Sequence, residues 1–271
     1  MNILIIGGGF IGTGLAMHFE KMHSVNVYVK TREGELPSVE IDLIVDSTSQ
    51  KSKKECEDFI AELTIFLELY PNAGVISLQS FSTLQTQPKS CVLPNFGSKA
   101  VMHTPYSRVK EFKEQCLLRG NFLRERIQFI YLPVVLGENG IWDQHSKVLR
   151  ATGKIVNIPD CKVDWVTISF ICTEIISLVN TRRNVKRVIA SEGVGYLDDL
   201  MGLSDSNRTK YWCSHFIDAF SFKLLKLFSR HPFFINAVFK VVEILFGRVS
   251  LYFPSIFYWL LFRQQSNFNK I

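Results

Sequence analysis

Tyr106 and Lys110 are the residues of this sequence whose types and spacing could carry acid–base chemistry. They open a segment with helical periodicity, and residues four apart lie on one face of a helix. A lysine ammonium beside a phenol lowers the pKa of the phenol and makes it a usable proton donor or acceptor near neutral pH. Ser80 follows a predicted strand upstream and adds a hydroxyl to the candidate set. The alternative for Tyr106 and Lys110 is an ordinary pair on a helix surface.

The N-terminus carries a second pattern with chemical meaning. An apolar run of strand length starts at Ile3, ends in glycines and opens onto a helical pattern from Ile11 to Met22. The glycines have the G-x-G-x-x-G spacing, which lets a strand turn tightly, lets backbone approach a pyrophosphate and lets the next helix pack close to the sheet. The helix N-terminus then offers free N–H groups to a phosphate. The pattern predicts dinucleotide binding by Gly7, Gly9, Phe10, Ile11 and Gly12. The alternative is a turn that only packs.

Two cations indicate which dinucleotide would bind. Lys30 and Arg32 follow the second predicted strand, 25–29, where a dinucleotide fold places the group that reads the adenosine ribose. An acid there would bind the 2′-hydroxyl of NAD, whereas two cations suit a 2′-phosphate. The sequence therefore favours NADP(H) and leaves NAD(H) open. The alternative is that both cations are solvated loop charges.

The remaining elements must position these residues. Further strands are predicted at 42–46, 75–78 and 127–132, with helices at 53–70 and 106–118. Strands that alternate with helices predict a parallel sheet covered on both faces, and right-handed crossovers make it doubly wound. The predicted fold class is α/β, of the Rossmann type. We expect a dinucleotide-binding domain over 1–204, with substrate-lobe elements at about 137–170 and 187–204, followed by a helical tail over 205–271.

From Met1 to about Leu203 the sequence resembles the extended branch of the short-chain dehydrogenase/reductase superfamily, the NAD-dependent epimerase/dehydratase proteins that modify nucleotide sugars. The resemblance rests on the glycine segment, the Ser80 loop, the Tyr-x-x-x-Lys pair, the Leu132–Gly137 segment and the Val163–Ser169 segment. It implies that Tyr106 is the general acid/base at a sugar hydroxyl or keto oxygen, and that Tyr106 and Lys110 are also among the residues that bind the cofactor. It implies that Lys110 lowers the pKa of Tyr106 and hydrogen-bonds the nicotinamide ribose. Ser80 would hydrogen-bond the same oxygen, although it could be a turn serine, with Ser77 or Ser82 in its place.

Departures from the family pattern narrow the choice of reaction that the protein could catalyse. The first two glycines of the motif are one residue closer than in the usual G-x-x-G-x-x-G. The dehydratases carry an Asp-Glu pair directly after the catalytic hydroxyl residue, whereas Phe81 and Ser82 stand here, so we discount a dehydratase. The expected function is reduction of a nucleotide- or lipid-linked keto sugar in surface polysaccharide or glycoconjugate biosynthesis. The alternatives are an NAD-dependent epimerase of the same family and a non-catalytic NADP(H)-binding sensor or membrane-tethered scaffold.

Charge separates the tail from the rest of the chain. Residues 205–271 contain nine Lys and Arg against three acids, nine minus three being +6, so they account for the whole net charge of +6. The neutral remainder argues against nucleic acid as a partner. The uncharged run from Val249 to Phe262 contains Pro254 and is short for a bilayer span.

Basic, aromatic, amphipathic helices of the kind that the tail predicts lie in membrane interfaces. The tail therefore predicts peripheral attachment. The alternatives are packing on the rest of the chain and a homodimer interface. Six scattered cysteines without a C-x-x-C pair predict reduced thiols in the cytoplasm and indicate no metal site.

Overall fold

The computed structural model describes residues 1–31, 36–80, 105–120, 126–140, 142–143, 162–181 and 187–200. The chain falls into two compact units. The first unit, Met1–Thr83, Tyr106–Gly140 and Trp165–Glu192, holds the main sheet and its helices. The described elements are β1 (Asn2–Ile6), α1 (Phe10–Phe19), β2 (Asn26–Lys30), β3 (Leu43–Asp46), α2 (Lys53–Leu69), β4 (Gly74–Ser80), α4 (Pro105–Arg119), β5 (Ile127–Leu132), β6 (Val134–Leu136), β7 (Lys162–Thr167), α6 (Ile168–Thr181), β8 (Arg187–Ile189), β9 (Gly193–Tyr196) and α7 (Leu197–Leu200).

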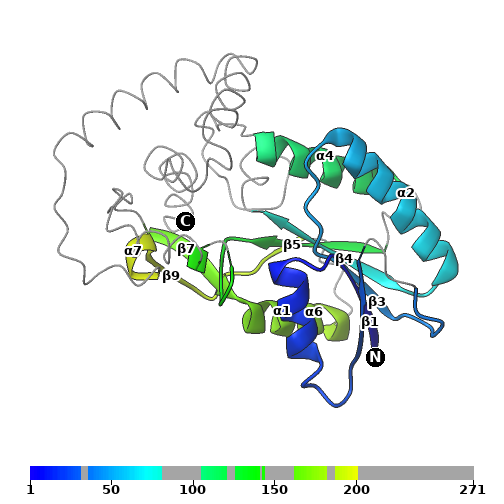
Figure 1. The fold of residues 1–271 in the computed structure, drawn as a ribbon, viewed down its shortest axis with the longest axis horizontal. Coiled ribbons are helices and arrows are strands. Elements are labelled where there is room, and N and C mark those ends of the chain that lie inside the picture. Colours follow the sequence, from blue (N-terminus) through cyan, green and yellow to red (C-terminus); the bar gives the residue numbers. More distant parts are fainter. Residues whose placement is uncertain are drawn as a thin grey trace. The chain divides into compact units, whose positions relative to one another are not determined.

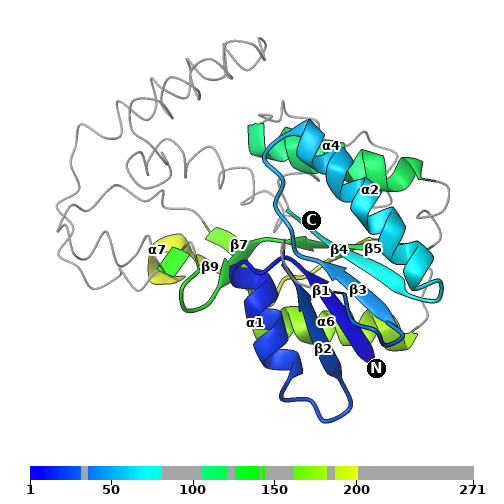
Figure 2. The same cartoon turned by 45° about the vertical axis from the view of Figure 1, so that its right-hand side comes forward.

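The main sheet is parallel, with strand order β2-β1-β3-β4-β5-β8. Helices α1 and α6 cover one face and α2 and α4 cover the other, as Figures 1 and 2 show. Parallel strands covered on both faces read as apolar runs, and β1 and β3 are buried along almost their whole length. The predicted α/β doubly wound fold is confirmed. The predicted strands and helices are present, with boundaries shifted by a few residues.

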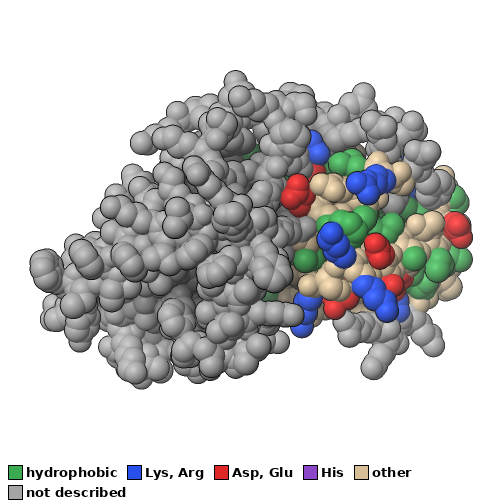
Figure 3. Space-filling model, turned by 90° about the horizontal axis from the view of Figure 1, so that it is seen from above, with side chains coloured by type: hydrophobic (Ala, Val, Ile, Leu, Met, Phe, Trp, Pro, Cys, Tyr) green, Lys and Arg blue, Asp and Glu red, His purple; other side chains and the backbone are tan. Residues whose placement is uncertain are grey.

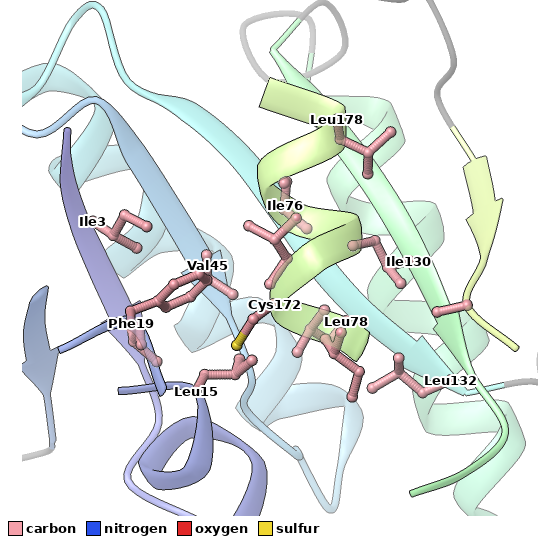
Figure 4. Close-up of a cluster of buried hydrophobic side chains, with 14 of the residues drawn as sticks. Ile3, Leu15, Phe19, Val45, Ile76, Leu78, Ile130, Leu132, Cys172 and Leu178 are labelled. Atoms are coloured by element: carbon pink, nitrogen blue, oxygen red, sulfur yellow. The ribbon is translucent and has the colours of Figure 1, made fainter. Parts of the chain in front are cut away.

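One hydrophobic cluster fixes α1 and α6 to the sheet. It takes its side chains from β1, β3, β4 and β5 on one side and from the two helices on the other (Figure 4). Phe19 of α1 and Cys172 of α6 are fully buried in it, and the unhindered backbone of Gly14 lets Ile168 of α6 approach α1 closely. This packing holds the N-terminal end of α1 beside the carboxyl end of β1.

The strand order differs from the usual doubly wound order at one edge. The classic order places a further strand–helix unit outside the second strand. Here β2 is the described edge strand, and β3 pairs with the other side of β1; the described part of the segment that crosses between them is residues 36–42. Tyr70 at the end of α2 donates a hydrogen bond to the Pro37 carbonyl at 2.6 Å and so ties this crossing segment to α2.

Helix α2 begins with a capping box, which fixes the position of its first turn. Ser52 Oγ accepts a hydrogen bond from the Glu55 N–H at 3.2 Å, and a Glu55 carboxylate oxygen accepts one from the Lys51 N–H at 2.7 Å. Ser52 thus satisfies one free N–H of the helix, while Glu55 reaches back to the N–H of the residue before the N-cap, in a variant of the capping box. Helix α1 has no side-chain cap at Gly9, so its first N–H groups are left for another partner.

The described surface over α2 and α4 mixes basic and acidic side chains (Figure 3). This mixture agrees with a body of the chain that is neutral overall. Among the described residues no helix is long and apolar enough to cross a bilayer. The predicted tail, 205–271, lies outside the described residues, as do most of 141–161 in the predicted substrate lobe.

Candidate dinucleotide and active site

The glycine turn between β1 and α1 has the backbone geometry that its spacing predicts. Gly7 has a φ of +110°, a conformation that favours glycine. A Cβ on Gly12 would lie 1.9 Å from the Gly7 carbonyl oxygen and 2.6 Å from Ser47 Oγ, so only glycine fits there. A Cβ on Gly9 would meet nothing within 4 Å. Gly12 thus serves close helix–strand packing, and Gly9 borders the open space where a phosphate could approach the uncapped helix end.

A cavity of about 740 Å³ lies beside this turn. Its lining comes from the ends of β1 and β2, from the loop after β3 and from the first turns of α2: Ile6, Gly7, Gly8, Lys30, Thr31, Thr48, Ser49, Gln50, Glu55, Asp58, Phe59 and Glu62. The cavity is therefore at the carboxyl ends of the strands, where open α/β sheets bind ligands. Of the two cations predicted to read the ribose, Lys30 lines it, while Arg32 lies outside the described residues.

Lys110 of α4 is buried, with 5% of its surface exposed, and its Nζ donates a hydrogen bond to the Thr48 carbonyl oxygen at 3.0 Å. Thr48 also lines the cavity, so the loop that binds Lys110 of α4 forms part of the cavity wall. Burial lowers the pKa of Lys110, partly offset by the nearby Asp46 carboxylate. Tyr106 lies in the first turn of α4, one helical turn before Lys110, and its side chain is outside the described part of the chain.

A buried ion pair, absent from the sequence-based prediction, lies beneath that loop. Lys113 Nζ lies 2.7 Å from an Asp46 carboxylate oxygen, and both side chains are fully buried. The same Nζ donates to Thr48 Oγ1 at 3.0 Å and lies 4.5 Å from the centre of the Phe59 ring. The pair joins α4 to the end of β3. The sequence places Lys113 three residues after Lys110, on the same face of the helix, but it does not identify Asp46 as the partner of Lys113.

The protonation states of this pair follow from its partners. Burial alone would raise the pKa of Asp46, but Lys113 and hydrogen bonds from Lys113, Ser77 and Thr48 outweigh it and hold that pKa below the ordinary value of 3.8. Burial lowers the pKa of Lys113 to about 8 against the opposing pull of Asp46. Near neutral pH the two groups are therefore a carboxylate and an ammonium.

Two short hydrogen-bond chains leave the Asp46 carboxylate. Thr48 Oγ1 donates to one carboxylate oxygen at 2.5 Å and accepts from Gln50 Nε2 at 2.7 Å. Ser77 Oγ donates to the other oxygen at 2.6 Å and accepts from Gln79 Nε2 at 2.9 Å. Both chains end on a buried glutamine whose Oε1 has no hydrogen-bond partner among the described residues. The charge of Asp46 fixes the direction of every donor in them.

The remaining candidates are distributed around this centre. Ser80 is the last residue of β4, and the alternation along that strand places Ser77 and Gln79 on the α2/α4 side, with Leu78 and Ser80 on the side of α1 and α6. Phe10 packs on Gly137 and Gly140 after β6, within 3.0 Å of where a Cβ on either would lie. Ile11 is half-buried in α1. The hydrogen bond from Lys110 to the Thr48 carbonyl joins α4 to the loop that lines the cavity.

The residues present fit the adenosine and phosphate portions of a dinucleotide. The fit rests on the open space at Gly9, the uncapped N-terminus of α1 and the cavity that continues from the glycine turn past Lys30 to α2. A Rossmann dinucleotide site has its pyrophosphate at this helix end and its ribose beside the end of the second strand.

No protein-family profile and no curated protein sequence matches the chain. Its fold is similar to that of many solved structures. A hypothetical dTDP-4-dehydrorhamnose reductase from Sulfolobus tokodaii matches with a TM-score of 0.54 and 12% identity, over 78% of this chain and 88% of that one. The dTDP-glucose 4,6-dehydratase of Bacillus anthracis, in complex with NAD, matches with a TM-score of 0.57 and 13% identity, over 76% and 82%.

The Bordetella bronchiseptica enzyme WbmG, also in complex with NAD, matches with a TM-score of 0.53 and 16% identity, over 76% of this chain and 79% of that one. Several other structures of similar fold carry the names of sugar-nucleotide reductases or dehydratases, or of a putative NAD-dependent epimerase/dehydratase. The chain therefore shares the α/β fold of these solved structures, as its motifs predicted.

Proposed function

We propose that this protein is a nicotinamide-dinucleotide-dependent oxidoreductase that reduces a keto group on a nucleotide- or lipid-linked sugar. The observation that carries the proposal is the cavity beside the glycine turn, whose loop at Thr48 holds Lys110. The proteins of similar fold support the substrate class, since several carry dTDP-sugar names. A role in surface polysaccharide or glycoconjugate biosynthesis agrees with such a substrate.

In the proposed reduction, Tyr106, Lys110 and Ser80 have separate roles. A reduced nicotinamide dinucleotide, when bound, would supply a hydride for the carbonyl carbon. Tyr106 gives its phenolic proton to the carbonyl oxygen, so that the ketone becomes an alcohol. The Lys110 ammonium stabilises the phenolate that remains, and Thr48 holds that ammonium in place through its carbonyl. Ser80 would donate a hydrogen bond to the same oxygen.

Tyr106→Phe tests this assignment. Loss of the proton donor should lower kcat by about 100-fold or more, since general acid catalysis contributes about 10²–10⁴-fold. Dinucleotide affinity should fall far less than kcat. Turnover is measured as NADPH oxidation with a panel of nucleotide-linked 4-keto sugars. Tyr28→Phe, on β2, is the matched control and should turn over like the wild type. Unchanged kcat in Tyr106→Phe on a competent sugar would exclude Tyr106 as the acid.

The cofactor preference is a finer proposal. We favour NADP(H), because Lys30 lines the cavity beside Thr31 and a cation there suits a 2′-phosphate. Titration of the protein with NADPH and NADH, followed by nicotinamide fluorescence, compares the two affinities directly. Tighter binding of NADH would contradict the preference. An epimerase would instead purify with bound NAD and consume no cofactor, and a non-catalytic sensor would bind dinucleotide without turning over any sugar.

For residues 205–271 we propose attachment to an anionic membrane surface, on the basis of their nine cations and many aromatic residues. The full chain should float with vesicles that contain acidic phospholipids, and a chain ending at residue 204 should not. Equal flotation of both would contradict the proposal. A change from dimer to monomer on truncation would indicate a homodimer interface instead.

A further inference from the structure

We propose that Asp46 and Lys113 are positioning residues for Lys110, the lysine that stabilises the Tyr106 phenolate in the proposed reaction. We call these two residues, together with Thr48, which joins them to Lys110, the lysine anchor. The inference rests on the proposed function and deepens it, because it names the groups that decide where the Lys110 ammonium lies. Asp46 and Lys113 act through Lys110 and are assigned no contact with the substrate.

Two ammonium groups share the backbone carbonyl of Thr48. Lys110 Nζ donates to this oxygen at 3.0 Å, and Lys113 Nζ donates to it at 3.3 Å. Both lysines are buried, and they lie on one face of α4 because they are three residues apart. Like charges that are held close together away from water repel each other strongly. The arrangement therefore depends on a negative charge that stays in place.

The Asp46 carboxylate supplies that charge from a fixed position. Asp46 is the last residue of β3, which pairs with β1 on one side and with β4 on the other. Ser77 on β4 donates a hydrogen bond to one carboxylate oxygen at 2.6 Å. The carboxylate is therefore held by the middle of the sheet, and its position does not depend on α4.

The described donors fill the acceptor sites of this carboxylate. Lys113 Nζ contacts both of its oxygens, at 2.9 and 2.7 Å. The Thr48 N–H at 3.0 Å and the Thr48 hydroxyl at 2.5 Å bind one oxygen, and Ser77 binds the other. An ionised carboxylate has about four acceptor sites, so these contacts leave no site for Lys110. Lys113 thus keeps Asp46 from binding Lys110, whose ammonium binds the Thr48 carbonyl instead.

Thr48 passes the position of the ion pair on to Lys110. Its N–H and its hydroxyl both donate to Asp46, and its hydroxyl accepts from Lys113 at 3.0 Å. Because the backbone and the side chain of Thr48 are both held, the direction of its carbonyl is fixed. Thr48 also lines the cavity beside the glycine turn. The lysine anchor therefore sets the place of Lys110 relative to the cavity in which we propose that the dinucleotide binds.

Loss of Lys113 should redirect Lys110. The Asp46 carboxylate would then have vacant acceptor sites next to an ammonium on the same face of α4. Burial lowers the pKa of Lys110 and the Asp46 carboxylate raises it, so these two charges already interact. An ammonium that moves to the carboxylate leaves the Thr48 carbonyl and the place that the Tyr106 phenolate requires. Removing the charge of Asp46 as well takes away the competing site.

The first experiment measures kcat and KM of the full-length protein with a nucleotide-linked 4-keto sugar and the reduced dinucleotide that binds more tightly. All values are taken per folded molecule, below the unfolding transition of each variant. Lys113→Met should lower kcat about tenfold or more, because small misplacements of catalytic groups are costly. Asp46→Asn/Lys113→Met should turn over about threefold faster than Lys113→Met. KM for the dinucleotide should change by less than about threefold in both. Lys54→Met, at an exposed position of α2, is the control and should keep the wild-type kcat.

Thr48 variants test the same inference while both charges of the ion pair remain. Thr48→Val removes the hydroxyl but keeps the size of the side chain and the backbone carbonyl, so kcat should fall about fivefold or more. Thr48→Ser retains the hydroxyl and should recover most of the wild-type kcat. Thr64→Val is the matched control, because the Thr64 hydroxyl bonds only the Ile60 carbonyl of its own helix among the described contacts and Thr64 lies outside the cavity lining.

The outcomes separate this inference from the proposed function. An ion pair with a purely structural role would lower stability and leave kcat per folded molecule unchanged. Wild-type kcat in folded Lys113→Met or in Thr48→Val, or a double variant no faster than Lys113→Met, therefore overturns the lysine anchor. If Tyr106→Phe still lowers turnover, the proposed function stands. A wild-type protein that reduces no sugar overturns both proposals. If Lys113→Met fails to fold, the two Thr48 variants decide.

Discussion

Replacing Lys113 with methionine is expected to lower the free energy of unfolding by about 3–5 kcal/mol, the cost of leaving one member of a buried ion pair without its partner. Both side chains are fully buried, and Lys113 contacts Asp46 and Thr48. The variant leaves the Asp46 carboxylate in an apolar setting with only hydroxyl and backbone donors. Equilibrium unfolding in urea measures the loss. Lys54→Met, at an exposed position of α2, should change stability by less than about 0.5 kcal/mol.

The pair is expected to be non-additive. Asp46→Asn combined with Lys113→Met removes both charges, so the double variant should be less destabilised than the sum of the two single variants. A double variant that loses the full sum would mean that the two residues act independently, against the geometry described above.

The same pair predicts an acid dependence. The pKa of Asp46 is lowered on folding, so the stability that it contributes is present above its ordinary pKa of 3.8. That stability is lost as the pH falls through the lower folded value. Unfolding curves between pH 3 and pH 7 should therefore show a weaker pH dependence for Asp46→Asn than for the wild type. Identical pH dependence in the two proteins would contradict the assignment.

The second large effect is expected at the glycine turn, where two substitutions to alanine should separate folding from binding. Gly12→Ala should destabilise the protein by about 3 kcal/mol, because its Cβ would overlap the Gly7 carbonyl oxygen at 1.9 Å and that backbone cannot move away without disturbing β1. The intrinsic preference of helices for alanine, about 1 kcal/mol, is too small to offset the overlap.

Gly9→Ala should leave stability within about 1 kcal/mol of the wild type, because nothing lies within 4 Å of the added Cβ and the φ of −78° is ordinary. Its dinucleotide affinity should fall at least tenfold, because the methyl group occupies the approach to the end of α1. Urea unfolding and nicotinamide fluorescence measure the two properties on the same samples. Undiminished affinity in Gly9→Ala would place the phosphate elsewhere.

Local sequence patterns were sufficient to predict most of the fold. The apolar runs that became β1, β3, β4 and β5 are strands buried on both faces, so their positions follow from composition alone. The glycine spacing predicted the turn, since Gly7 and Gly12 meet steric requirements that only glycine satisfies. The pairing of Tyr106 with Lys110 on α4 follows from helical periodicity, and their catalytic roles remain predictions.

Other features depend on contacts between residues far apart in the sequence. Lys113 and Asp46 are joined only because α4 packs across the end of β3, and no local pattern indicates that partnership. The charge of Asp46 then orients Thr48 and Gln50, which decides that the unpartnered atom of the buried Gln50 amide is its oxygen. The position of β2 at the sheet edge likewise follows from strand pairing, since the sequence has no signal for the order of strands. The sequence by itself determined the α/β fold and the dinucleotide motif, because both arise from local periodicity and steric limits. The tertiary structure alone decided how the cavity is lined and charged, because those properties arise from long-range packing.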